Sequence, residues 1–294
     1  MSEMQPTGGE PDITAVSETL FLPLYALALE SRRPHPIIVD EGVVALTQRL
    51  NEQFAASDRR LFRRLAAGRL PGTLLTTVSL RIRHFDEVVR EFLEREPDGV
   101  VVSLGCGLDD RRRRVDNGRM RWFDLDLPEV IEFRRAWLAE TDRMRYIARS
   151  VLDHSWMDEL PDEPGSRFLF IAEGLFMYLP PDDVRALVVA LRERFAGSEL
   201  VCEIASDWAI AQMHTAFGRG KMRRQFSLSH DVVFEFGVAS GHDIEAWAEG
   251  IELIGAWNYY DENEPKLRLM SLFARMDRIR WLQWVARFRL GRSG

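Results

Sequence analysis

The segment 101–112 constrains the fold of this chain more than any other stretch. A short apolar run ends there in Gly105-Cys106-Gly107, and the later segment 121–126 alternates apolar and polar residues and ends in acid. A strand, a glycine turn and an acid at the tip of the next strand are typical of a nucleoside pocket. The glycines let the backbone approach the ligand, and the carboxylate accepts hydrogen bonds from both ribose hydroxyls. The plainer alternative is an ordinary strand–helix turn of an α/β domain.

The glycine pattern favours a nucleoside without phosphates. A dinucleotide fingerprint would place a third glycine at the position of Asp110. An acid there would repel a pyrophosphate, which needs a helix N-terminus free of negative charge. S-adenosylmethionine (SAM) fits instead, because it is adenosine carrying a sulfonium and an amino acid tail.

Composition excludes several classes of protein. The 294 residues suffice for one large domain or for a core with an appended subdomain. A net charge of -7 argues against a nucleic-acid partner, whose binding face would be basic. No run of about 18 apolar residues occurs and the N-terminus has no signal pattern, so we expect a cytoplasmic protein without stable membrane association. The cysteines, Cys106 and Cys202, are expected to be small core residues with reduced thiols.

The hydrophobic pattern divides the chain into segments. Residues 1–12 are predicted to be a disordered tail and 13–96 a helical cap, because apolar residues recur there at helical spacing. From 97 to 276 strands alternate with helices, as in a cofactor-binding core. The predicted strands are 100–104, 121–126, 145–148, 168–173, 200–205, 251–258 and 268–274.

The order of these strands predicts the fold class. Helices separate the first five strands, which requires a parallel sheet, whereas a short loop joins the last two into an antiparallel hairpin. We therefore predict an α/β fold with a seven-stranded, mostly parallel sheet, a terminal antiparallel hairpin and a helical N-terminal cap. This is the Rossmann-like sheet of the class I SAM methyltransferases.

Two further segments flank the last strands. The stretch from about 207 to 243 is predicted to be an insertion that contributes to an acceptor site. The basic, aromatic segment 277–294 is predicted to be a C-terminal helix. It would pack on its own sheet or on a second subunit of a homodimer, or else lie on an acidic membrane surface or carrier protein.

Four motifs resemble those of the leucine carboxyl methyltransferase family, and within it the bacterial branch typified by the tetracenomycin polyketide O-methyltransferases. The resemblance runs from about residue 19 to 275. The motifs are Arg81-Ile82-Arg83-His84-Phe85-Asp86, the segment 101–109, Asp124-Leu125-Asp126-Leu127-Pro128 and Ala172-Glu173-Gly174-Leu175-Phe176-Met177-Tyr178-Leu179.

The resemblance implies a role for each matching residue. Arg81 would bind the carboxylate of the SAM methionine tail, with Arg83 facing elsewhere on the same helix. Gly105 and Gly107 would pass under the cofactor. Asp126 would take the ribose hydroxyls, and Glu173 would lie beside the ammonium or sulfonium end.

The chain departs from the family pattern in two places. Ser150 stands where the family has an aspartate that contacts the adenine amino group. We therefore expect that contact to be weaker, or to be carried by backbone at Ser150 and Val151. Asp110 replaces the usual threonine and would be an extra acid near the cofactor.

The catalytic candidates follow from the chemistry of methyl transfer, which mainly requires alignment and exclusion of water. A carboxylate acceptor is ionised at neutral pH and needs no base, whereas a phenol with a pKa of about 10 benefits from one. Tyr178 would lie near the methyl group, or would be a packing aromatic. His214 and His230 are candidate bases in a region rich in methionine and phenylalanine, which favours a flat aromatic acceptor.

We therefore predict a SAM-dependent O-methyltransferase acting on a carboxyl or phenolic oxygen of a small, polyketide-like metabolite. Two alternatives come from other classes. An NAD-dependent oxidoreductase is disfavoured by the missing third glycine and the terminal hairpin. A non-catalytic partner protein with this fold would not need the combination of Arg81, Asp126 and Glu173.

Overall fold

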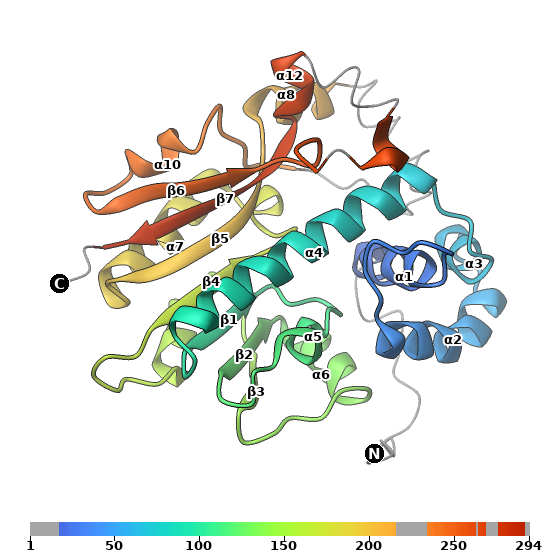
Figure 1. Ribbon diagram of the computed structural model, residues 1–294, viewed down its shortest axis with the longest axis horizontal. Helices are drawn as coiled ribbons and strands as arrows, with labels where there is room; N and C mark the ends of the chain where they lie inside the picture. The colour runs from blue at the N-terminus through green and yellow to red at the C-terminus, as the bar shows by residue number, and fades with distance from the viewer. Residues whose placement is uncertain (1–17, 216–233, 263, 269–275, 292–294) are drawn as a thin grey trace.

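A computed structural model describes residues 18–215, 234–262, 264–268 and 276–291. Its centre is a seven-stranded sheet in the order β3-β2-β1-β4-β5-β7-β6 (Figure 1). The strands are β1 (Val100–Leu104), β2 (Arg121–Asp126), β3 (Met144–Ala148), β4 (Phe168–Ala172), β5 (Ser198–Ala205), β6 (Ile251–Trp257) and β7 (Gln283–Leu290). The first five are parallel, and β7 runs antiparallel to both β5 and β6. This arrangement confirms the predicted α/β class with its antiparallel end.

Helices cover both faces of the sheet, as its apolar central strands require. α4 (Gly72–Arg95) packs Phe85 and Val89 on one face, against Val101 of β1. On the other face, α7 (Pro181–Arg194) packs Leu187 and Leu191 against the alternate residues of the same strands. Within the described ranges, no helix combines the length and apolar character needed to span a membrane.

The remaining helices are short and lie mostly between strands. They are α5 (Arg111–Val115), α6 (Pro128–Arg135), α8 (Asp207–Met213), α10 (His242–Glu245) and α12 (Asp277–Arg280). Single 3-10 turns occur at η1 (Glu18–Leu20), η2 (His154–Glu159), η3 (Phe176–Tyr178) and η4 (Pro265–Leu267).

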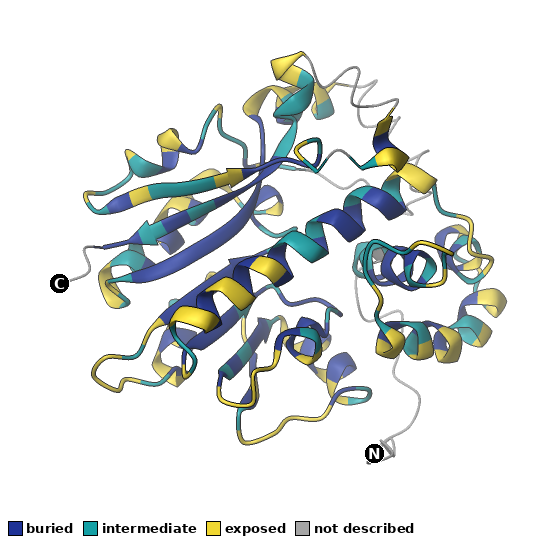
Figure 2. Ribbon diagram, in the orientation of Figure 1, coloured by how far each residue is buried: buried dark blue, intermediate teal, exposed yellow. Residues whose placement is uncertain are grey.

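The N-terminal helices form a group of their own beside the sheet (Figure 1). They are α1 (Phe21–Ser31), α2 (Glu41–Ala56) and α3 (Arg60–Ala66). The Phe21 ring meets the rings of Phe54 and Phe62 edge-to-face at 4.9 and 5.4 Å, and that of Phe133 on α6 at 5.7 Å. The three helices bury their apolar sides and expose their outer sides (Figure 2). Because Leu108 belongs to the same apolar cluster, this group packs next to the glycine turn that follows β1.

The C-terminal segment corrects the sequence-based prediction. The second strand of the hairpin is β7, whereas the predicted strand 268–274 lies mostly outside the described residues. The predicted helix over 277–294 is wrong, because only the single turn α12 is helical and the sheet continues to Leu290 rather than ending at 276.

The pattern of β7 has period two rather than the helical 3.6. Phe288 and its alternate neighbours enter the core, while Arg287 pairs with Glu199 and Arg289 with Glu252. Arg287 and Arg289 therefore each pair with an acid on the neighbouring strand instead of forming a basic helical face.

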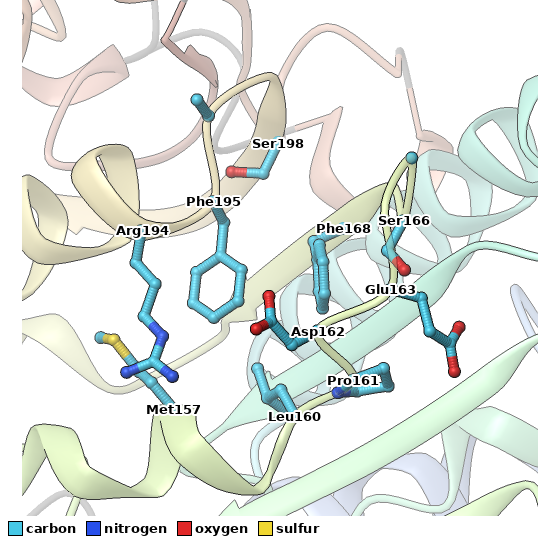
Figure 3. Close-up of a pocket in the computed structure, with 12 residues that line it drawn as sticks. Met157, Leu160, Pro161, Asp162, Glu163, Ser166, Phe168, Arg194, Phe195 and Ser198 are labelled. Atoms are coloured by element: carbon cyan, nitrogen blue, oxygen red, sulfur yellow. The ribbon is translucent and has the colours of Figure 1, made fainter.

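One cavity, of about 140 Å³, lies where β4 and β5 begin and α7 ends. Figure 3 shows the rings of Phe168 and Phe195, 4.7 Å apart, and the side chain of Ser198 among its lining residues. These residues stand at the amino ends of the strands. Ligands of open α/β sheets bind at the carboxyl ends, so the functional site is expected at the opposite edge.

The strand assignment of the C-terminal segment predicts a specific stability effect. Phe288 is 0% exposed, so Phe288→Ala should lower the free energy of unfolding in urea by about 3–5 kcal/mol. Arg289→Ala is the matched control on the same strand and should cost at most about 1 kcal/mol, because its ion pair with Glu252 is exposed. Equally small losses in both variants would contradict the buried strand.

Candidate active site

The residues predicted to bind the cofactor gather at the carboxyl edge of the parallel strands. Gly105 and Gly107 follow β1, and Asp126 is the last residue of β2. Ser150 follows β3 and Glu173 follows β4. The fold thus brings together residues that are up to 68 positions apart (173 minus 105) in the sequence.

The glycine turn depends on the absence of side chains. Gly105 and Gly107 have φ angles of +63° and +52°, in the left-handed region that only glycine enters without strain. A Cβ atom on Gly105 would lie 2.8 Å from Cδ1 of Leu175, which is closer than packed carbon atoms approach. Position 105 therefore requires glycine both for its backbone conformation and for the space that the Leu175 side chain occupies.

The carboxylate of Asp126 is fixed by this turn. Its Oδ2 accepts the N–H of Gly107 at 2.7 Å and its Oδ1 accepts the N–H of Leu127 at 2.8 Å. Burial raises the pKa of Asp126 above its ordinary value, and the two N–H donors partly oppose that rise. Each oxygen retains a lone pair for a further donor, as a ribose diol would supply.

Beneath the turn lies a buried arginine that sequence reasoning missed. Arg134 of α6 donates from Nη1 to the carbonyls of Gly107 and Asp109 at 2.9 and 2.7 Å. Its Nη2 donates to Oδ2 of Asp124 at 2.6 Å, and Trp122 Nε1 donates to the other oxygen at 2.7 Å. Asp124 and Arg134 thus hold the carbonyls of the turn, while Asp126 accepts the N–H of Gly107.

Asp110 is engaged by arginines. Its carboxylate accepts hydrogen bonds from Nε of Arg112 and from Nε of Arg113, both at 2.7 Å. Burial raises the pKa of Asp110, and the two arginines act against that rise. Two ion pairs within the protein therefore balance the negative charge of Asp110, the residue that departs from the family pattern.

Arg81 lies between two carboxylates. Its Nε donates to Oε1 of Glu173 at 2.7 Å, and its Nη1 donates to both oxygens of Glu203 at 2.8 and 2.9 Å. Burial acts to lower the pKa of Arg81, but the two carboxylates outweigh burial and hold it above its ordinary value. The Nη2 group makes no hydrogen bond to any residue that the structure describes. Arg83 faces away and pairs with Glu262 at 2.7 Å.

Glu203 was missed by the sequence analysis although a signal existed. It is 0% exposed on β5 and also accepts hydrogen bonds from the Tyr259 hydroxyl at 2.8 Å and from Gln283 Nε2 at 2.6 Å. A lone acid at the end of or within an apolar strand is costly unless it is paired, and this criterion singles out Glu173 in the sequence. It applied equally to Glu203.

Glu173 meets cations of the protein itself. One oxygen accepts from Arg81, and the other from Nη2 of Arg111. Arg111 in turn donates to the buried Asp86 at 2.6 Å. Because two arginines already satisfy Glu173, its burial alone does not demand a positively charged ligand. Each carboxylate oxygen still has a second lone pair.

Tyr178 and His214 both meet Phe234, on the side of the predicted acceptor site. The Tyr178 ring is edge-to-face with the Phe234 ring at 4.9 Å. Although the residue is 39% exposed, desolvation and then the charge of Glu203 raise the pKa of Tyr178 to about 12. His214 Nε2 lies 2.9 Å from the Phe234 carbonyl, which can only accept, so this nitrogen carries a proton. The third candidate, His230, lies outside the described residues.

Ser150 and Val151 lie at the loop after β3. The Ser150 hydroxyl accepts the N–H of Leu152 at 3.3 Å. Val151 packs its side chain in the core, and its carbonyl accepts from Trp156 Nε1 at 3.0 Å. A contact from Val151 to a ligand would therefore have to use its backbone rather than its side chain.

The polar groups at this edge suit SAM. Arg81 offers a donor for a carboxylate, and Asp126, held by the glycine turn, offers acceptors for a diol. Among the described residues, no group of histidine, cysteine and acidic side chains is arranged to hold a metal ion.

The sequence is similar to those of known methyltransferases. A model of the leucine carboxyl methyltransferase family matches residues 22–192. The chain is 28% identical over 255 residues to the tetracenomycin polyketide synthesis O-methyltransferase TcmP of Streptomyces glaucescens, covering 85% of each chain. It is also 28% identical over 208 residues to the S-adenosyl-L-methionine-dependent methyltransferase dpfgK of Gibberella zeae, covering 68% of each.

A solved structure supports the fold. The crystal structure of a DUF574 family protein from Streptomyces avermitilis has a TM-score of 0.51 and 14% sequence identity. The match covers 93% of this chain and 97% of that one.

The glycine turn can be tested by a matched pair of substitutions. Gly105→Ala combines the cost of a left-handed alanine, about 1–2 kcal/mol, with a clash against Leu175. We expect it to weaken SAM binding in isothermal titration by at least about tenfold. Gly118→Ala is the control, because Gly118 has a φ of +80° but no atom within 4 Å of an added Cβ. Unchanged SAM affinity in Gly105→Ala would show that the turn does not contact the cofactor.

Proposed function

Because the chain belongs to the leucine carboxyl methyltransferase family and is a SAM-dependent methyltransferase, we propose that it methylates an oxygen of a small, polyketide-like metabolite. The observation that carries the proposal is that Arg81 and Asp126 both lie at one edge of the sheet, in a chain similar to TcmP. The acceptor oxygen is a carboxylate or, as the second candidate, a phenol.

The proposed cofactor site uses the groups that the fold leaves available. Arg81 donates from Nη2 to the methionine carboxylate, and Asp126 accepts from the ribose hydroxyls. Glu173 accepts from the ammonium group with its remaining lone pairs, while the turn at Gly105 and Gly107 lies under the cofactor. Bound SAM supplies a methyl group already activated by the sulfonium, so the protein need only align the acceptor and exclude water.

The adenine is proposed to lie between two exposed leucines. Leu127 follows β2 and is 44% exposed, and Leu152 follows β3 and is 38% exposed. Large exposed apolar side chains at a ligand-binding edge are typical of a site that covers a flat ring. Ser150, on the same loop as Leu152, offers its hydroxyl to the base.

The acceptor side is proposed to take an aromatic molecule. Tyr178 and Phe234 present ring edges and faces there, and Trp208 in the first turn of α8 is 40% exposed. Ile210, on the same helix, packs with Phe234. Aromatic side chains provide a large contact area for a flat ligand.

The protonation states at the site favour a carboxylate acceptor. With a pKa of about 12, Tyr178 stays protonated at neutral pH and can donate a hydrogen bond, but it cannot remove a proton. The Nε2 of His214 donates to the Phe234 carbonyl, so only its Nδ1 could accept a proton. A carboxylate arrives ionised and needs neither Tyr178 nor His214 as a base. His214, through Nδ1, and His230 remain the candidate bases for a phenol.

Two of the earlier expectations belong with this proposal. We propose that the enzyme acts in the cytoplasm, where the buried free thiols of Cys106 and Cys202 would remain reduced. A homodimer remains a prediction. The alternative of an NAD-dependent oxidoreductase receives no support, because the relatives are SAM-dependent methyltransferases.

The proposed reaction is tested by transfer of labelled methyl from SAM to a panel of aromatic carboxylic acids and phenols of matched size. We expect label in a base-labile ester for the acids. Label appearing only on nitrogen-containing acceptors, or on none of the panel, would contradict O-methylation of this class.

The dependence of the rate on pH separates the two acceptor classes. For a carboxylic acid, kcat/KM should be flat between about pH 6 and 9, because the acceptor is ionised and Tyr178 stays protonated below its pKa of about 12. For a phenol without a base, it should rise about tenfold per pH unit toward the phenol pKa. A carboxylic acid whose kcat/KM rises through neutral pH would instead reveal an essential base.

A further inference from the structure

We propose that Glu203 is a positioning residue for the cofactor, holding the Arg81 guanidinium so that its Nη2 faces the cofactor carboxylate. The inference rests on the proposed role of Arg81. It extends that role to a buried carboxylate on β5 and to the C-terminal hairpin.

Donors from separate parts of the fold converge on one oxygen of Glu203. Oε1 accepts from Arg81 Nη1 of α4 at 2.8 Å, from the Tyr259 hydroxyl after β6 at 2.8 Å and from Gln283 Nε2 of β7 at 2.6 Å. Oε2 accepts from Arg81 at 2.9 Å. These contacts leave the carboxylate no freedom to rotate.

The donors around Glu203 also compensate for its burial. A fully buried carboxylate is stable as an anion only with a cation and enough donors, and Arg81, Tyr259 and Gln283 supply them. Burial, and then the charge of Glu203, raise the pKa of Tyr259, so its hydroxyl remains a donor at every physiological pH.

Two of the three guanidinium nitrogens of Arg81 are therefore fixed by the protein. Glu173 holds Nε and Glu203 holds Nη1, which leaves Nη2 as the group that can meet a ligand. A free arginine side chain would lose rotamer freedom on binding a carboxylate. Here that loss occurs on folding, so the arginine is preorganised when the cofactor arrives.

A purely structural role for Glu203 predicts something different. If Glu203 only stabilised the sheet, its replacement would weaken all cofactor-like ligands equally or not at all. If it positions Arg81, the loss is confined to ligands that carry the amino acid carboxylate. Two probes separate these cases, because S-adenosylhomocysteine has that carboxylate and 5′-methylthioadenosine lacks the amino acid part.

The experiment is isothermal titration of both probes into the wild type and Glu203→Gln, which keeps the shape but removes the charge. We expect the Kd of S-adenosylhomocysteine to rise about 10- to 100-fold, as for loss of a charge-assisted interaction. The Kd of 5′-methylthioadenosine should change by less than about threefold.

Glu199→Gln is the matched control. Glu199 lies on the same strand, is 7% exposed and pairs with Arg287 at 2.6 Å and Arg95 at 2.8 Å, but it stands at the opposite end of β5. Its replacement should leave both Kd values unchanged, whatever it costs in stability. Urea unfolding of each variant confirms that the titrated protein is folded.

The outcomes are distinct. Equal weakening of both probes in Glu203→Gln, or an unchanged Kd for S-adenosylhomocysteine, would overturn the positioning role. A wild type that binds neither probe would overturn the proposed function, and this inference with it. If Glu203→Gln does not fold, Tyr259→Phe removes one neutral donor and keeps the carboxylate. That variant should then raise the Kd of S-adenosylhomocysteine alone by about two- to fivefold, and no change would count against the inference.

Discussion

The ion pair of Arg81 with Glu173 and Glu203 is the interaction on which the rest of the site depends. The carboxylate of Glu173, just after β4, and that of Glu203, within β5, share one guanidinium, and either would be costly in this place without its partners. The same guanidinium links the N-terminal half of α4 to β5 and to the residue that follows β4. Through Tyr259 and Gln283 the cluster also includes the C-terminal hairpin. The Arg81–Glu203 ion pair therefore connects α4 with β5 and the C-terminal hairpin, beside the place where the cofactor tail is proposed to bind.

The charged network continues from this cluster to the helical cap. Arg114 donates to Asp86 of α4 at 2.7 Å and to Asp40 at 2.5 Å, and Asp40 also caps α2 through the N–H of Val43. At the same edge, a Cβ on Gly107 would lie 3.3 Å from Cδ2 of Leu20. The cap is thus tied to the core by ion pairs and rests on the glycine turn by apolar contact. Both links place the N-terminal helices over the cofactor edge of the sheet.

Much of the fold was predictable because its signals are local. Helices between strands specify a parallel sheet, and the glycine turn and the acid of Asp126 lie at strand ends that can be recognised from a few residues each. β7 was missed because alternating arginines and aromatic residues were taken for a basic helix, and its pairing with β5 is long-range. Arg134 was missed because its partners are distant in the sequence, and Glu203 carried a signal, an acid within an apolar strand, but not the identity of its partners. Nothing beside them in the sequence identifies the partners that the fold brings to them.

The most direct measurement is a crystal structure of the protein with S-adenosylhomocysteine. We predict the homocysteine carboxylate within hydrogen-bonding distance, about 3 Å, of Arg81 Nη2, with Glu203 still bound to Nη1 and the ribose hydroxyls on Asp126. A carboxylate bound elsewhere, or an Arg81 that leaves Glu203 to reach it, would contradict the preorganised site.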